Sequence, residues 1–138
     1  MNLNLKEKVI IVTGGAKGIG EGISSQLALE GAFPVILGRN AKDNELALEK
    51  ITAAGGFGFT VEAELSNPDE CKKAVDAVLA RFGKIHGLVN NAGANDGIGL
   101  ENGDYEGFMA SLHRNVVHYY LLAKYCLPSL IETKGSIV

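Results

Sequence analysis

Residues 9–20 read VIIVTGGAKGIG, and this stretch decides the fold. Its opening β-branched run, VIIV, is typical of a strand buried on both faces. After it, Ile19, Ile23 and Leu27 recur at helical spacing, which predicts a helix over residues 19–30. The intervening glycines permit a tight turn and close backbone approach, and the helix start offers unpaired N–H groups to a phosphate. The stretch therefore predicts a strand, a phosphate-binding loop and a helix; the alternative is a loop that only turns the chain.

The same alternation of strand and helix continues along the chain. Apolar runs predict further strands at residues 34–37, 57–61, 88–89 and 136–138. Helical spacing and caps predict helices over residues 41–53, from Pro68 to Phe82, and over residues 105–130. No linker, repeat or low-complexity stretch interrupts this pattern. We therefore expect one domain over residues 1–138, of the α/β class, with an open parallel sheet and helices on both faces.

Composition excludes several classes of function. The chain has 138 residues, 46% of them apolar, and a net charge of −3, as in an ordinary globular domain. Its scattered cations argue against a nucleic-acid surface, and no apolar run approaches the ~18 residues of a membrane span. Cys71 and Cys126 lie far apart, which favours a reduced, cytoplasmic chain. Three histidines are too scattered to bind a metal: His86, His113 and His118.

The loop spacing, G-x-x-x-G-x-G, resembles the cofactor loop of the short-chain dehydrogenase/reductase family. Further matches occur in the family's order, namely Glu64-Leu65 after the third strand, Asn90-Asn91-Ala92-Gly93 after the fourth, and Asn115 in the long helix. The resemblance covers residues 6–138 and implies a Rossmann-type sheet, here truncated at the start of the fifth strand.

The resemblance also implies a set of cofactor contacts. The loop would wrap the diphosphate and ribose, Glu64 and Leu65 would lie at the adenine ring, and the residues after the fourth strand would line the cofactor. These residues are Gly14, Ala16, Lys17, Gly18, Ile19, Gly20, Glu64, Leu65, Asn90, Ala92 and Gly93. Taken alone, Asn90-Asn91 would be an ordinary turn pair.

The end of the second predicted strand favours NADP over NAD. An acidic residue at this point usually holds the adenosine ribose 2′-OH, but residues 37–40 read LGRN and offer no carboxylate. Arg39 suits a 2′-phosphate instead, because a guanidinium pairs with phosphate in a forked geometry, and Lys17 adds a second cation. If both cations are merely solvated, NAD is the alternative cofactor.

The family's chemistry is hydride transfer between the nicotinamide and an alcohol or carbonyl carbon, using a serine, a tyrosine and a lysine four residues after that tyrosine. Only Tyr120 and Lys124 have that spacing, and they lie in the long helix, at the wrong place for the family's pair. Of the catalytic set the chain holds Asn115, which joins a proton relay in the family. We therefore expect the cofactor-binding part of a longer oxidoreductase that lacks the C-terminal catalytic part; the alternative is a noncatalytic cofactor-binding fragment.

The segment after Gly93 bears on the substrate. Asn95 and Asp96 offer hydrogen-bonding groups at the ligand-binding end of the sheet, which suits a hydroxyl-rich substrate, although both could serve only as turn residues. With the later HYY and YCLP strings, the segment resembles sugar dehydrogenases of the L-fucose dehydrogenase type, which act on a hemiacetal. The alternative within the family is a 3-oxoacyl reductase. The resemblance further implies a homo-oligomer, a dimer or tetramer formed through the long helix.

Overall fold

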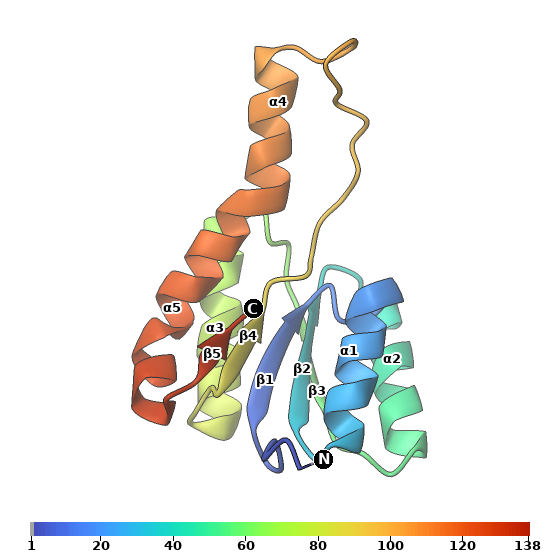
Figure 1. The fold of residues 1–138 in the computed structure, drawn as a ribbon, viewed down its shortest axis with the longest axis vertical. Coiled ribbons are helices and arrows are strands. Elements are labelled where there is room, and N and C mark those ends of the chain that lie inside the picture. The colour runs from blue at the N-terminus through green and yellow to red at the C-terminus, as the bar shows by residue number, and fades with distance from the viewer. Residues whose placement is uncertain (1) are drawn as a thin grey trace.

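The computed structural model describes residues 2–138, which form a five-stranded parallel sheet with helices on both faces (Figure 1). The strands are β1 (Val9–Thr13), β2 (Phe33–Gly38), β3 (Phe59–Glu62), β4 (Gly87–Val89) and β5 (Ser136–Ile137), in the order β3-β2-β1-β4-β5. The helices are α1 (Gly18–Leu29), α2 (Ala41–Ala53), α3 (Pro68–Phe82), α4 (Tyr105–Leu112), the π-helical turn η1 (His113–Val117) and α5 (His118–Thr133). The predicted Rossmann-type α/β architecture is confirmed. No helix within residues 2–138 is long and apolar enough to cross a membrane.

Both faces of the central strands are buried, as their β-branched sequence indicates. On β1, Ile10 and Val12 belong to the core that α1 covers, whereas Val9 and Ile11 belong to the core that α3 and α5 cover. Figure 1 shows α1 and α2 on one side of the sheet and α3 and α5 on the other. Because side chains alternate along a strand, an apolar run that is continuous in sequence supplies both layers.

The predicted start of α3 is confirmed. Asn67 Oδ1 accepts hydrogen bonds from the backbone N–H of Asp69 at 3.0 Å and of Glu70 at 3.4 Å, and Pro68 occupies the first turn. At the other end, Gly83 adopts a left-handed conformation with φ of 73°. A polar cap, a first-turn proline and a terminal glycine therefore fix both ends of this helix.

The helix predicted over residues 105–130 is not continuous. The π-turn η1 separates α4 from α5 and rotates their faces relative to each other. A continuous helix would place Phe108 and Val116 on the same apolar face as Cys126, but they are 55% and 51% exposed. Leu122 and Cys126 of α5 are buried against the sheet, whereas α4 projects beyond it (Figure 1).

The order of the strands in the sheet reverses at one point. The chain runs outward from β1 to β2 and β3, then returns past β1 to β4 and β5, so the order reverses between β1 and β4. The strands are parallel and nearly in register, with Thr13 opposite Leu37 and Val12 opposite Val89. Their carboxyl ends consequently meet at one edge, where ligands of open α/β sheets bind.

Candidate cofactor site

A cavity of about 400 Å³ opens at this carboxyl edge. The loops after β1, β2, β3 and β4 supply most of its wall. The end of β2, the first turn of α2 and the segment around η1 supply the rest. The lining residues are Gly14, Ala16, Lys17, Leu37, Gly38, Arg39, Asn40, Asp43, Asn44, Ala63, Glu64, Leu65, Ser66, Asn91, Ala92, Gly93, Ala94, Arg114 and His118. The cavity lies within the size range of sites for small molecules and cofactors.

The loop between β1 and α1 depends on its glycines. Gly14 and Gly18 have positive φ angles of 62° and 55°, which other residues rarely adopt. A Cβ on Gly20 would lie 2.1 Å from Gly14 O, so the start of α1 packs directly against the loop backbone. Lys17, the N-cap residue, makes no side-chain capping hydrogen bond. Within residues 2–138 the first-turn N–H groups of α1 thus receive no capping side chain, and the loop fits a diphosphate.

Thr13 joins the two strands where the sheet order reverses. Its Oγ1 accepts hydrogen bonds from the backbone N–H of Asn91 at 2.9 Å and of Ala92 at 2.8 Å, and donates to Val89 O at 3.3 Å. Asn91 Nδ2 donates in return to Thr13 O at 2.9 Å. These bonds fix the loop after β4 against the glycine loop, so the two parts of the cavity wall share one scaffold.

Two cations and two carboxylates lie where the loops after β1, β2 and β3 meet the cavity. Lys17 Nζ lies 2.7 Å from Asp43 Oδ2, and Arg39 Nη1 lies 3.9 Å from Glu64 Oε2. Both cationic side chains are about three-quarters exposed, at 74% and 77%. Exposed pairs of this kind hold weakly, so both cations remain available to an anionic ligand.

Glu64 is held as a carboxylate at the end of β3. Its Oε1 accepts hydrogen bonds from the Ser66 backbone N–H at 3.1 Å and from Ser66 Oγ at 2.9 Å. These two bonds hold the pKa of Glu64 below its ordinary value, and Arg39 acts in the same direction. Leu65 beside it is 8% exposed and gives the cavity an apolar patch. An acidic group next to an aliphatic side chain can receive the polar edge and the face of a flat base.

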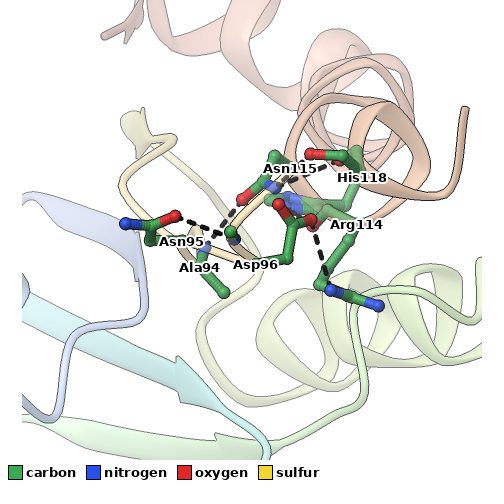
Figure 2. Close-up of polar contacts among 8 residues, drawn as sticks. Ala94, Asn95, Asp96, Arg114, Asn115 and His118 are labelled. Carbon is green, nitrogen blue, oxygen red and sulfur yellow. Dashed lines mark hydrogen bonds and ion pairs between the residues drawn. The ribbon is translucent and has the colours of Figure 1, made fainter. Parts of the chain in front are cut away.

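The segment after β4 is bound to the η1 turn by two side chains (Figure 2). Asn115 Oδ1 accepts a hydrogen bond from Ala94 N–H at 2.7 Å, and its Nδ2 donates to Ser111 O at 3.1 Å. Arg114 Nη1 lies 3.2 Å from Asp96 Oδ2. A hydrogen bond from Ser111 is the main cause that holds the pKa of Asp96 below its ordinary value. The start of this segment is therefore fixed to the helix, although the segment itself has no regular structure.

His118 is part of the same wall and is only 2% exposed. Its Nε2 is 3.0 Å from Arg114 O, and its Nδ1 is buried with no hydrogen-bond partner among residues 2–138. A carbonyl can only accept, so the neutral imidazole carries its hydrogen on Nε2. Burial lowers the pKa of His118, which keeps this ring neutral at pH 7.

The structure brings most of the predicted cofactor residues together. Eight of them line the cavity, namely Gly14, Ala16, Lys17, Arg39, Glu64, Leu65, Ala92 and Gly93. Four others are not among the residues that line the cavity within residues 2–138, namely Gly18, Ile19, Gly20 and Asn90. Of the residues expected near the substrate, Asn95 Oδ1 accepts from Gly97 N–H at 3.0 Å, and the Asp96 carboxylate engages Arg114.

Sequence reasoning assigns no role to several groups of this site. Thr13 and Asn91 belong to recognised motifs in which no role falls to them, Asp43 is predicted only as a helix residue, and Ser66 and Arg114 are not singled out. A threonine that closes an otherwise apolar buried strand was the available signal, because a buried hydroxyl needs partners. The position of Asp43 opposite Lys17 depends on how α1 and α2 pack, which no local pattern encodes.

Comparison with known proteins agrees with this geometry. The family model described as short chain dehydrogenase matches residues 8–138. The 11-beta-hydroxysteroid dehydrogenase A of Sesamum indicum is 32% identical, covering 95% of this chain and 38% of its own length. The glucose and ribitol dehydrogenase of Daucus carota is 35% identical over 97% of this chain and 48% of its own.

Solved structures of related proteins also superpose on this chain. The Cj0485 dehydrogenase has a TM-score of 0.88 and 40% identity, over 99% of this chain and 52% of its own. A metagenomic short-chain oxidoreductase in complex with NADP also has a TM-score of 0.88, with 32% identity, over 96% of this chain and 61% of its own. The chain thus spans between about two fifths and three fifths of the proteins it matches. Because the family model matches nearly the whole chain, this protein belongs to the short-chain dehydrogenase family.

Proposed function

We propose that the protein is an NADP-dependent oxidoreductase and that residues 1–138 supply its cofactor-binding part. The observation that carries the cofactor assignment is the cavity wall itself, where the glycine loop and Arg39 lie together and Gly38 stands at the end of β2 instead of an acidic residue. A 2′-hydroxyl would find no carboxylate at that strand end, whereas a 2′-phosphate would find Arg39 and Lys17. The solved relative that carries NADP supports this assignment.

In this proposal the residues of this chain bind the cofactor and orient it. When bound, the nicotinamide supplies or accepts the hydride. The N-terminus of α1 and the glycine loop hold the diphosphate, and Leu65 and Glu64 receive the adenine. Asn115 joins the proton relay at the cavity edge, where its amide already fixes Ala94. The serine, tyrosine and lysine of the family's chemistry would come from outside residues 1–138.

The finer proposal is a sugar-like substrate, an alcohol or hemiacetal of the kind used by L-fucose dehydrogenases. The segment after β4 supports it, because Asn95 and Asp96 directly follow Ala94 of the cavity wall, and Asp96 pairs with Arg114, another residue of that wall. The likeness to a glucose and ribitol dehydrogenase points in the same direction. Initial-rate assays of the native enzyme should show oxidation of L-fucose or a related pyranose with NADP. Turnover of hydroxysteroids or 3-oxoacyl thioesters in place of sugars would overturn this substrate.

Direct binding tests the cofactor. We expect NADPH to bind more tightly than NADH by calorimetric titration, and Arg39→Gln to weaken NADPH by about tenfold or more, since a hydrogen bond to a charged group is worth about 1.5–3 kcal/mol. Arg81→Gln is the matched control, because it removes an exposed arginine of α3 that is not part of the cavity wall. An equal loss of affinity for NADPH and for NADH in the Arg39 variant would refute the role of Arg39.

The intact mass of the native protein should exceed the 14.5 kDa of this chain.

Two properties of the whole protein belong to the same proposal. We propose a homo-oligomer formed along α4 and α5, because Phe108, Met109 and Tyr120 are 55%, 44% and 66% exposed there. Light scattering should give a dimer or tetramer, and a monomer at micromolar concentration would refute it.

We also propose a cytoplasmic setting, supported by Cys71 and Cys126, which are buried and unpaired.

A further inference from the structure

Lys17, one of the two cations proposed to read the 2′-phosphate, is held by a carboxylate of the chain itself. Lys17 extends from the N-cap of α1, and Asp43 stands in the first turn of α2, so the pair spans two elements. Their charged atoms are 2.7 Å apart, and both residues line the cavity. A ligand phosphate at this corner of the cavity would meet Asp43 as well as Lys17.

Asp43 differs from the other carboxylate in the wall. Glu64 is fixed by the Ser66 backbone N–H and hydroxyl, and its distance to Arg39 is the longer one, 3.9 Å. Asp43 has Lys17 as its ion-pair partner, and its side chain is 24% exposed, within reach of solvent and ligand. Its backbone is held independently, because its N–H donates to Asn40 Oδ1 at 3.0 Å. A change confined to the Asp43 carboxylate should therefore leave α2 in place.

We propose that Asp43 is a specificity-determining residue, which competes with the 2′-phosphate of the cofactor for Lys17 and so limits the preference for NADP over NAD. This inference rests on the proposed function and deepens it. A phosphate monoester carries a charge of about −1.5 to −2 at pH 7, so it attracts Lys17 more strongly than a single carboxylate does. Binding must nevertheless separate the Lys17–Asp43 pair and bring the phosphate close to the remaining carboxylate.

Asp43→Asn removes the competing charge with almost no change of shape. The phosphate no longer has to separate an exposed ion pair or to face a like charge, and each effect is small, so affinity for a 2′-phosphate should rise about two- to thirtyfold. Affinity for the same ligand without that phosphate should stay unchanged. If Asp43 instead positioned Lys17 for the phosphate, the same substitution would lower the affinity, so the direction of the change decides between the two roles.

The experiment compares adenosine 2′,5′-bisphosphate with adenosine 5′-monophosphate, titrated calorimetrically into the native protein at low salt. These probes differ only in the 2′-phosphate and do not require the nicotinamide half of the site. Asp76→Asn is the matched control, since it also neutralises an aspartate paired with a lysine, Lys72 at 2.6 Å, on the exposed face of α3. A urea unfolding curve checks that each variant is folded.

The expected result is tighter binding of the bisphosphate by Asp43→Asn alone, with a gain that shrinks as salt screens the charges. An unchanged or weaker bisphosphate affinity, or an equal gain for the monophosphate or in Asp76→Asn, would overturn the inference. Its failure differs from that of the cofactor proposal. If the wild type does not prefer the bisphosphate but Asp43→Asn does, the inference holds and the native cofactor is NAD. If the wild type prefers it and Asp43→Asn adds nothing, only the inference fails.

Discussion

Thr13→Val is the sharpest test of how the cavity is held together. The substitution preserves the branched shape of the side chain but removes the hydroxyl that joins the end of β1 to the loop after β4. The Thr13 side chain is fully buried, and its Oγ1 is the acceptor for the backbone N–H groups of both Asn91 and Ala92. Ala92 N–H would lose its acceptor, and Asn91 N–H would keep only its longer bond to Val89 O at 3.2 Å.

The expected cost follows from these bonds. A buried donor left without an acceptor costs about 1–3 kcal/mol, and Ala92 is only partly buried, so its loss belongs to the lower part of that range. The loss of the shorter bond of Asn91 and of the bond to Val89 O adds to it, so the free energy of unfolding should fall by about 1–3 kcal/mol in total. For a chain of this size each kcal/mol shifts the melting temperature by roughly 3–4 °C, so Tm should fall by roughly 3–12 °C.

Urea unfolding followed by circular dichroism measures this cost. Thr52→Val is the matched control, because the Thr52 hydroxyl donates to Leu48 O at 2.9 Å on the exposed side of α2. That variant should stay within about 0.5 kcal/mol of the wild type. If Thr13→Val and Thr52→Val unfold at the same urea concentration, the hydroxyl does not hold the two loops together. A second readout is NADPH affinity, which should fall in Thr13→Val alone.

Three further substitutions test separate parts of the structure. Gly20→Ala should abolish cofactor binding and lower stability by several kcal/mol, about 3 or more, because its Cβ would lie 2.1 Å from Gly14 O; an unchanged affinity in titration would contradict this packing. Asn67→Ala should cost about 1 kcal/mol in urea unfolding, the usual loss for an N-cap. Val9 N–H donates to His86 Nδ1 at 3.0 Å, and burial lowers the pKa of His86. The unfolded chain therefore takes up this proton first as pH falls, so stability is full above about pH 6.5 and declines below it. His86→Gln should lose part of that decline, and an identical pH profile would show that His86 is not its source.

The fold could be predicted because its signals are local. Each strand is a short β-branched or apolar run, and each helix has helical spacing or a cap, as at Asn67. Parallel alternation then leaves few topologies, since crossovers between parallel strands are right-handed. The glycine loop could likewise be recognised, because its conformation depends on residues adjacent in the chain. Residues 9–20 alone determine this conformation, and no contact with a distant segment is needed.

The rest of the site depends on contacts between distant segments. The η1 turn interrupts a region whose composition is helical throughout, and nothing in its sequence, HRNVV, marks the extra residue. Asn115 fixes Ala94, and Thr13 fixes Asn91, across separations of 21 and 78 residues. Such pairs follow from how helices and strands pack, so the polar residues were visible in the sequence while their partners were not. The exposure of Val116 has the same origin, because a π-turn changes which side of a helix faces the sheet.

The charged side chains of the cavity act on the selectivity between NADP and NAD more than on the affinity for the diphosphate that both cofactors share. Each cation in its wall is held by a carboxylate, the pairs being Lys17–Asp43, Arg39–Glu64 and Arg114–Asp96. Because these charges already offset one another, a diphosphate must be bound chiefly by the backbone N–H groups of the glycine loop and α1, which NAD and NADP would use alike. The 2′-phosphate instead has to draw Lys17 and Arg39 away from their partners. Raising the salt concentration should therefore weaken NADPH binding more than NADH binding, since exposed side-chain charges are screened more than a helix terminus packed against its own loop. Equal salt dependence for both cofactors would mean that side chains, and not the backbone, hold the diphosphate as well.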